Sequence, residues 1–517
     1  MKSSFSAFNS SAMTSSTLVR ALAGLSALAA GFLLLSPRAL AAPDPALAGK
    51  KVLLLVGEPD EDHPSDDAAV QAHLQALGLT VTLGKDEDPA SRAAGQDLVV
   101  ISGTVNPYVV PHAYKHAAVP VLTWSAPTYP TLGLTGRLRH KDFDIIEPTQ
   151  HFAQSFTDLY GYCVDPLHPI AREAGLPSQM FGTLYLQPSV TCWGRPGPAA
   201  QVIAIFEGDP NKAGLFTYEK GASLSDGAVA PARRVGFFLG TGNFHLLTAV
   251  HGPAARDPAA QAWYVGLKLF DASVHWALTP PPAPPPAAPA ALHAALAQAA
   301  AGKKVLFVER IDSPEGKEAD EHNVAYLRGL GFTVTVVDQD APQGAEAGQD
   351  LVVLSATCSK YKLNGKYGKI TQPIMCHEGL AADGLKMAGW KRYVDYGEHG
   401  EEKESEDPEE SYLDIVGAWH PLAAGFKAGP IAFIKEPGTL KWATPTRGAI
   451  VIATLPYAPE QCAIFGYERG SVMVDDYVAP ARRLLFPLDN PAFDDLTENG
   501  LVLYDAAVLW CIGAPGS

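Results

Sequence analysis

The sequence predicts an α/β protein that holds two copies of a three-layer α/β/α sandwich, each with a mostly parallel sheet. Three observations predict this class: an internal repeat, short apolar runs that alternate with helical segments, and a Pro- and Ala-rich stretch between the copies. The repeat opens with GKKVL at Gly49–Leu53, which returns at Gly302–Leu306. A chain of 517 residues is long enough for two or three domains, and the repeat predicts two.

The first half of each copy has the pattern of a parallel sheet. In the first copy Val52–Val56 is a continuous apolar run, as a strand buried on both faces requires. Asp66–Leu77 has apolar residues near helical spacing, and Gly78 stands where a C-terminal cap belongs. Further strands are expected at 79–83, 97–102 and 119–124, with a helical connection at 107–117. Strands separated by helical segments predict right-handed parallel crossovers.

The second half of each copy predicts an antiparallel edge. VIAIFEGD (202–209) and AGLFTYEKG (213–221) are strands divided by a short polar turn, and VIATLPYA (451–458) and CAIFGYERG (462–470) repeat them. Similar helices at 267–276 and 501–510 close the two copies. The stretch 279–301 between them predicts a semi-rigid linker with a short helix.

The N-terminal residues have the features of a signal peptide. Residues 1–41 contain three basic residues and no acid, a 15-residue apolar stretch at Ala21–Leu35, and the small-x-small sequence Ala39-Leu40-Ala41. We therefore expect an exported protein, periplasmic or extracellular, with no stable membrane insertion; the alternative is an uncleaved anchor. The predicted domains are 42–278 and 302–517.

Composition excludes several classes of partner and site. With 55 acidic and 39 basic residues the net charge is −16, which disfavours nucleic acid and anionic membranes as partners. The six cysteines have no zinc-site spacing, and we expect no metal and no cofactor. Two interpretations of the thiols stay open, namely disulfides such as Cys163–Cys192 and Cys358–Cys376, or free buried thiols.

Several short motifs resemble one superfamily. Strand 97–102, a helix and the run Val119–Ser125 resemble the stretch that leads into the nucleophile elbow of class I glutamine amidotransferases. The HP turns at His168 and His420, the YEKG and YERG turns, and the closing Trp276 and Trp510 resemble the trehalose-utilisation (ThuA-like) branch. The resemblance covers about 49–278 and 302–513 and implies a flavodoxin-like fold.

The sequence departs from this superfamily at the nucleophile. Amidotransferase chemistry needs a cysteine thiolate at the elbow, where the two copies have Ser125 and Glu378. Ala126 stands in place of the glycine that commonly relieves strain there. Cys376 precedes the elbow by two positions, on the strand face of Glu378. We therefore do not expect glutamine hydrolysis.

Candidate site residues follow from the rule that ligands bind beyond the carboxyl ends of parallel strands. The catalytic candidates are Glu309, His377 and Glu378, because carboxylates beside an imidazole can exchange protons. Trp124 can stack on a sugar ring. The further ligand-binding candidates are Ser125, Glu58, Arg310 and Cys376, and Asp60, Asp62 and His63 share the loop of Glu58. The alternatives are a solvated loop with an Asp cap at 58–67 and a satisfied His377–Glu378 pair.

Other polar motifs have a structural interpretation. Ser125 could act as a nucleophile with His63 or His245, but no GxSxG frame surrounds it. We expect the HP histidines to bond turns, and the pairs Arg233-Arg234 and Arg482-Arg483 to bond backbone carbonyls or acids. The acidic run 397–411 and the insertion 249–263 are expected to be surface loops.

Three functions remain open. The leading hypothesis is a non-hydrolysing binding protein for a small polar ligand, a sugar or its oxidised derivative. The second is a carbohydrate-active enzyme that uses His377, Glu378 and Glu309, which would place the chemistry in the second copy. The third is a structural module in which the two domains pack on each other.

Overall fold

The computed structural model describes residues 45–58, 65–146, 160–176, 180–182, 191–248, 265–280, 289–363, 365–399, 410–490 and 492–513. Several predictions lie outside these ranges: the signal peptide, the insertion 249–263, residues 400–409 of the acidic run, and the candidates Asp60, Asp62 and His63.

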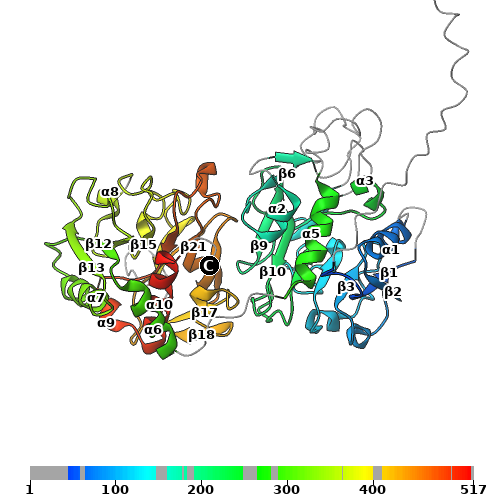
Figure 1. The fold of residues 1–517 in the computed structure, drawn as a ribbon, viewed down its shortest axis with the longest axis horizontal. Coiled ribbons are helices and arrows are strands. Elements are labelled where there is room, and N and C mark those ends of the chain that lie inside the picture. The colour runs from blue at the N-terminus through cyan, green and yellow to red at the C-terminus, as the bar shows by residue number, and fades with distance from the viewer. Residues whose placement is uncertain are drawn as a thin grey trace, which may run out of the picture. The chain divides into compact units, whose positions relative to one another are not determined.

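The first copy is built on an 11-stranded sheet in the order β2-β1-β3-β4-β11-β10-β9-β6-β7 (Figure 1). Its parallel part consists of β2 (Thr80–Lys85), β1 (Lys51–Val56), β3 (Leu98–Ile101), β4 (Val121–Thr123) and β11 (Arg234–Gly236). The antiparallel part consists of β10 (Ala213–Tyr218), β9 (Gln201–Phe206), β6 (Tyr160–Cys163) and β7 (Met180–Gly182). β8 (Thr191–Gly194) branches from β10 and pairs with β5 (Phe143–Ile146).

The second copy repeats this order as β13-β12-β14-β15-β22-β21-β20-β17-β18. The strands are β13 (Thr333–Asp338), β12 (Lys304–Glu309), β14 (Leu351–Leu354), β15 (Ile374–Cys376), β22 (Arg483–Leu485), β21 (Ala458–Tyr467), β20 (Ile450–Leu455), β17 (Tyr412–Ile415) and β18 (Gly429–Ala432), with β16 (Tyr396–His399) and β19 (Leu440–Ala443) as the branch. The predicted α/β class, the parallel core of each sheet and the antiparallel edge are confirmed.

Each sheet carries helices mainly on one face. In the first copy these are α1 (Asp67–Ala76), α2 (Pro169–Ala174), α3 (Phe244–Thr248) and α5 (Gly266–Leu278). Val52 and Leu54 of β1 pack in their cluster, while Leu53 and Leu55 pack in the cluster of the other face. That other face is covered by short 3-10 turns, and the connection expected at 107–117 is one of them, at His112–His116. Pro111 immediately precedes this turn and Ala117 returns to extended backbone, so it stays short.

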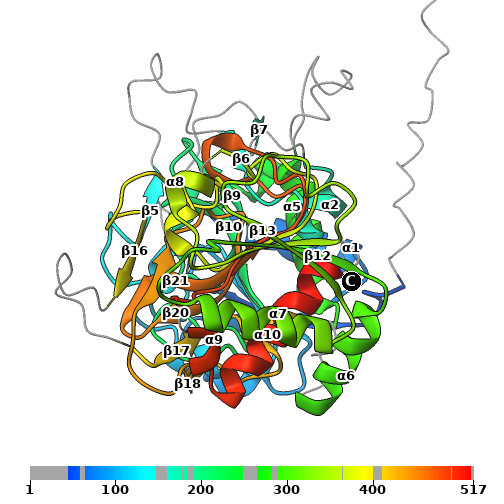
Figure 2. The same ribbon diagram turned by 90° about the vertical axis from the view of Figure 1, so that its left-hand side faces the viewer.

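The second copy has a helical layer of its own, made of α6 (Pro289–Ala300), α7 (Lys317–Gly329), α9 (Ala492–Asp495) and α10 (Glu498–Ile512); a short α8 (Lys360–Leu363) follows β14 (Figure 2). The short helix expected in the linker is α6. It buries Leu292 and Leu296, packs on α10, and places His293 Nδ1 2.8 Å from Asp505 Oδ2. This helix is therefore part of the second copy's helical layer and not only a spacer.

The repeated arginine pairs hold the fold together. Arg233 makes a bidentate ion pair with Glu219 (2.8 and 2.9 Å), and its guanidinium lies 4.2 Å from the ring centre of Trp276. The buried Arg234 donates to backbone carbonyls, among them those of Lys115 (2.9 Å) and Ala117 (2.8 Å). Arg482 and Arg483 repeat both arrangements. The structural interpretation of these pairs is confirmed.

The HP histidines cap turns, as expected. The rings of His168 and His420 accept hydrogen bonds at Nδ1 from the backbone N–H of Ile170 and Leu422, both at 3.2 Å. Burial lowers the pKa of both histidines to about 3, so both are neutral and able to accept these bonds.

All six cysteines are free and buried, so neither Cys163–Cys192 nor Cys358–Cys376 is a disulfide. β14 and β15 are neighbours as expected, but Cys358 and Cys376 use their thiols as donors to the carbonyls of Val308 (3.3 Å) and Glu378 (3.2 Å).

In the described ranges no helix has both the length and the apolar character needed to cross a membrane.

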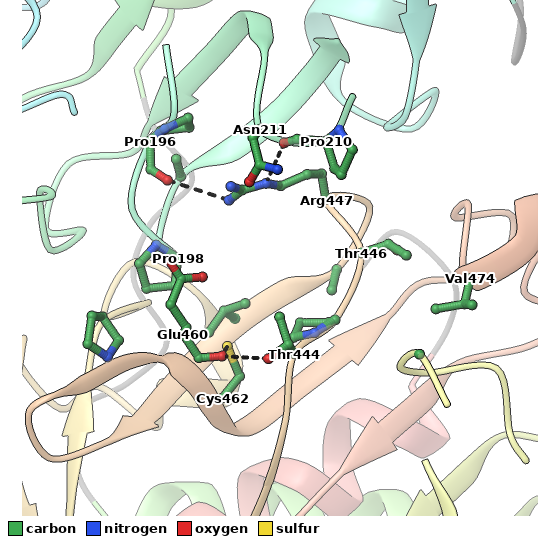
Figure 3. A pocket seen from close by; sticks show the side chains of 16 residues that line it. Pro196, Pro198, Pro210, Asn211, Thr444, Thr446, Arg447, Glu460, Cys462 and Val474 are labelled. Carbon is green, nitrogen blue, oxygen red and sulfur yellow. Dashed lines mark hydrogen bonds between the residues drawn. The ribbon is translucent and has the colours of Figure 1, made fainter. Parts of the chain in front are cut away.

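Residues Asp44–Ser517 form one compact unit, within which the two copies contact each other. Arg447 of the second copy donates to the carbonyls of Pro210 (3.0 Å) and Pro196 (3.4 Å) of the first, beside a cavity of about 260 Å³ (Figure 3). Arg195 and Glu460 form an ion pair at 2.7 Å.

Candidate functional site

A cavity of about 560 Å³ lies in the first copy, at the carboxyl ends of its parallel strands. Glu58 follows β1, Thr104 follows β3, Trp124 and Ser125 follow β4, and Thr241 follows β11. This is the edge at which open α/β sheets bind ligands. Three of the predicted ligand-binding residues, Glu58, Trp124 and Ser125, therefore line one cavity.

Two polar groups in this cavity are available to a ligand. Among the described residues, neither the Ser125 hydroxyl nor the Trp124 indole N–H has a hydrogen-bond partner, although both side chains are nearly buried. The neighbouring hydroxyls are already engaged: Thr241 donates to the carbonyl of Gly103 (2.9 Å), and Thr104 donates to Asp67 (2.7 Å). A ligand here can therefore gain two hydrogen bonds without breaking one.

The cavity is acidic. Its described lining includes the carboxylates of Glu58, Asp86 and Glu87 and neither lysine nor arginine. The Asp86 carboxylate accepts a hydrogen bond from the backbone N–H of Asn106 (2.9 Å), which fixes it at the rim. Glu58 and Glu87 are exposed, and Glu58 Oε1 lies 3.8 Å from Lys85 Nζ, so water and this lysine screen the charges and the lining disfavours an anion only modestly.

The elbow positions do not have the geometry of a nucleophile elbow. Ser125 lies in extended backbone with φ −92° and ψ 91°, and Glu378 has φ −77° and ψ 87°, so neither residue has the positive φ of a left-handed turn. His245, one proposed base for Ser125, lies on α3, where its Nδ1 is 3.8 Å from Asp66 Oδ2. His63 lies outside the described residues.

In the second copy the elbow glutamate is part of a buried ion pair. Lys441 Nζ lies 2.6 Å from Glu378 Oε2 and 3.4 Å from Asp489 Oδ1. The two carboxylates raise the pKa of Lys441 above its ordinary value, so the side chain stays cationic. Nothing in the sequence indicated that Lys441 would meet Glu378, because 63 positions separate them.

His377 is a neutral residue of the core. Its ring packs 5.9 Å from Tyr504 and 6.3 Å from Phe486, measured between ring centres, and only 1% of the residue is exposed. Burial lowers its pKa to about 3, with a further contribution from Lys441. Its Nε2 is buried without a hydrogen-bond partner among the described residues.

Glu309 and Arg310 diverge after β12. Glu309 is 7% exposed, and burial, with the charge of Asp320 second, raises its pKa to about 7. Arg310 turns outward and pairs with Asp312 at 3.0 Å. Within the described chain, no hydrogen bond or ion pair joins Glu309, His377 and Glu378 to one another, so the predicted catalytic group does not form a bonded constellation in this structure.

One repeated polar network was missed from the sequence. The Asp320 carboxylate accepts hydrogen bonds from Ser355 Oγ (2.6 Å) and Thr357 Oγ1 (2.8 Å). Asp67, Ser102 and Thr104 form the same network in the first copy. All three residues are identical at the repeat offset of 253, a signal that could have revealed them. Burial raises the pKa of Asp320 to about 6.

The described residues contain no group of three or more His, Cys, Asp or Glu side chains placed to hold a metal ion. This finding concerns the described part of the site only, and the loop that follows Glu58 lies outside it.

Comparisons with known proteins give no family. No family model matches the chain, and no curated protein matches it. Solved structures that match include a protein from Thermoplasma acidophilum described as a GMP synthase component (12% identity, TM-score 0.24, 44% of this chain and 98% of that one). The N-terminal domain of mmIFT52 also matches (11% identity, TM-score 0.28, 45% of this chain and 98% of that one). Similarities at these TM-scores establish neither family nor activity, so the fold described above rests on the chain's own strand order.

Proposed function

We propose that the protein is an exported binding protein whose first copy holds a small neutral polar molecule, such as a sugar. The observation that carries the proposal is the cavity of about 560 Å³ in which the Ser125 hydroxyl and the Trp124 indole N–H lack partners among the described residues. Its size falls within the range of small-molecule sites, roughly 300–1,000 Å³. Export rests on the signal-peptide pattern of residues 1–41.

The hydrogen-bonding groups of the lining suit a ligand rich in hydroxyls. The Trp124 ring is 3% exposed and packs against Phe270, 5.9 Å between ring centres, so it offers the cavity its N–H donor and no open face for stacking. The carboxylates of Glu58, Asp86 and Glu87 can accept hydrogen bonds from such hydroxyls, and they disfavour the oxidised, anionic derivative of a sugar.

The enzyme hypothesis has weaker support. Glu309 has the raised pKa of a proton-sharing group, but Glu378 is paired with Lys441 and His377 is neutral inside the core. A purely structural role would leave the two polar groups of the first cavity without a purpose.

The proposal is tested on the full mature chain by thermal shift with three sets of compounds: neutral mono- and disaccharides, amino sugars, and uronic acids. A neutral or amino sugar present at 100 times its Kd should stabilise the chain by about 2.7 kcal/mol. Ser125→Ala should weaken that binding by roughly 3- to 10-fold, since one hydrogen bond is lost.

Ser91→Ala is the matched control, because Ser91 is an exposed serine of the same copy outside the cavity. The proposal fails if no neutral or amino sugar shifts the melting temperature, or if Ser125→Ala and Ser91→Ala respond alike.

A further inference from the structure

Three of the positions at which the two copies differ place a charged cluster in the second copy where the first has its cavity. Ser125 corresponds to Glu378 at the offset of 253 that relates the early strands. Cys192 corresponds to Lys441, and Gly240 to Asp489, at the offset of 249 that relates the later ones.

Strand pairing supports these equivalences. Gly194 of β8 pairs with Ala213 of β10, and Ala443 of β19 pairs with Cys462 of β21, again at an offset of 249. Ser125, Cys192 and Gly240 all line the open cavity of the first copy.

At these positions the second copy has large charged side chains that bond one another. Lys441 projects from β19 between Glu378 (2.6 Å) and Asp489 (3.4 Å), and both Lys441 and Glu378 are only 4% exposed. The charge of the neighbouring Glu398 also favours the cation, and Glu398 itself pairs with Arg392 at 2.7 Å. One ammonium group thus occupies the place that is open in the first copy.

A fourth position also differs beside this charged cluster. Gly379 replaces Ala126, and a Cβ added to Gly379 would lie 2.6 Å from Lys441 Cβ, closer than side-chain carbons approach. The backbone of Gly379 does not need a glycine, since its φ is not among the positive ones. Every residue except glycine carries a Cβ, so this contact reflects the close approach of the backbones at 379 and 441 and does not depend on the lysine.

We infer that the second copy has a ligand site that is filled by its own Lys441, and that Glu378 and Asp489 form a receptor for a primary ammonium group. The first copy, with Cys192, Ser125 and Gly240 at these positions, keeps the site open. This inference deepens the proposed function, because it identifies the residues that decide which copy binds.

Chemical rescue tests the inference without a ligand of the first copy. Lys441→Ala in the full chain removes the ammonium and leaves Glu378 buried without its cation, so the melting temperature should fall by on the order of 10 °C. Propylammonium chloride, which replaces the missing part of the side chain, should restore much of this loss with a saturable dose response. Propan-1-ol and tetramethylammonium chloride should not.

Lys386→Ala is the matched control, because Lys386 forms an exposed ion pair with Asp475 (2.7 Å). Propylammonium should leave its melting temperature unchanged. Wild-type stability of Lys441→Ala, or an equal propylammonium effect on both variants, would overturn the inference.

Lys441→Met keeps the test decisive if Lys441→Ala does not fold, because methionine fills much of the same volume without charge. Burial then raises the pKa of Glu378 with no cation beside it, so this variant should regain stability, relative to the wild type, as the pH falls from 8 to 5. A constant difference from the wild type over this window would contradict the inference.

A further variant transfers the residues of the second copy's charged cluster to the equivalent positions of the first copy. The variant S125E/A126G/C192K/G240D places the charged cluster in the first copy and should abolish the sugar-induced thermal shift. If no sugar shifts the wild type, the proposed function fails while the rescue result stands. If a sugar still binds the exchanged variant, these positions do not decide which copy is open.

Discussion

Glu309, a residue that differs between the two copies, makes the stability of the folded chain depend on pH. It ends β12 where the first copy has Val56, and its carboxyl is buried near Asp320, Glu321 and Asp338, while the nearby cation of Lys317 partly offsets these charges. Burial and these negative charges raise its pKa from 4.5 to about 7. The charged form is therefore disfavoured in the folded state, and the group contributes stability at low pH that is lost as the pH rises through about 7.

We expect Glu309→Gln to stabilise the chain at pH 8.5 by on the order of 1–2 kcal/mol, because the neutral amide removes a buried negative charge. The gain should disappear near pH 4, where the carboxyl is protonated in both the folded and unfolded states of the wild type. Thermal melts of the variant and the wild type between pH 4 and pH 8.5 measure this difference in stability. Glu58→Gln, at a side chain that is 91% exposed, should show no such trend. A gain for Glu309→Gln that does not depend on pH would contradict the assignment.

At the scale of elements, the turn after β10 depends on a left-handed residue. Gly221 has φ +93° and its counterpart Gly470 has φ +96°, which explains the glycine in the YEKG and YERG sequences. A Cβ at Gly221 would meet no atom within 4 Å, so the cost of a side chain there is purely one of backbone conformation.

We expect Gly221→Ala to destabilise the chain by about 1–2 kcal/mol, the cost of placing a side chain in left-handed backbone. Gly329→Ala is the matched control: Gly329 ends α7, its φ is not positive, and a Cβ there also meets open space. This control should gain roughly 0.5–1 kcal/mol from a better helix former. Denaturant melts of both variants check the pair, and equal effects would refute the conformational explanation.

At the scale of the whole molecule, each copy has its own sheet and closing helix, yet the two share contacts. The half-buried Arg447 of the second copy donates to two carbonyls of the first, and the backbone N–H of Ser223 donates to the carbonyl of Val416 (2.9 Å). The second copy also keeps α6 as part of its helical layer, through Leu292 and Leu296.

We expect fragments 42–280 and 289–517 each to unfold in one cooperative transition, at a lower temperature than the full chain because the contacts between copies are lost. A fragment 302–517 should be less stable than 289–517, since burial of Leu292 and Leu296 contributes about 1.5–3 kcal/mol per residue. Calorimetry measures the cooperativity and the melting temperature of each of the three fragments. Non-cooperative unfolding of 42–280 or 289–517 would exclude independent domains, and equal stability of 289–517 and 302–517 would exclude a packing role for α6.

Sequence patterns alone predicted the repeat, the α/β class, the antiparallel edge and the structural roles of His168 and Arg233. These features depend on local patterns: identity at a fixed offset, apolar periodicity, and the chemistry of a turn or of a pair of neighbouring residues. The same patterns brought Trp124 and Ser125 to the correct sheet edge, because the carboxyl ends of parallel strands share one edge.

The cavity of the first copy and the buried Lys441–Glu378 pair of the second could be recognised only from the three-dimensional structure. Lys441 reaches Glu378 across 63 positions, and Cys192 meets the region of Ser125 only because β8 branches from β10 in the sheet. The carboxylate and imidazole at 377–378 therefore predicted chemistry in the second copy, where the fold supplies a lysine that engages the carboxylate and a core that encloses the imidazole. Charge and burial at a site depend on strands that are distant in the chain, and no local pattern carries that information.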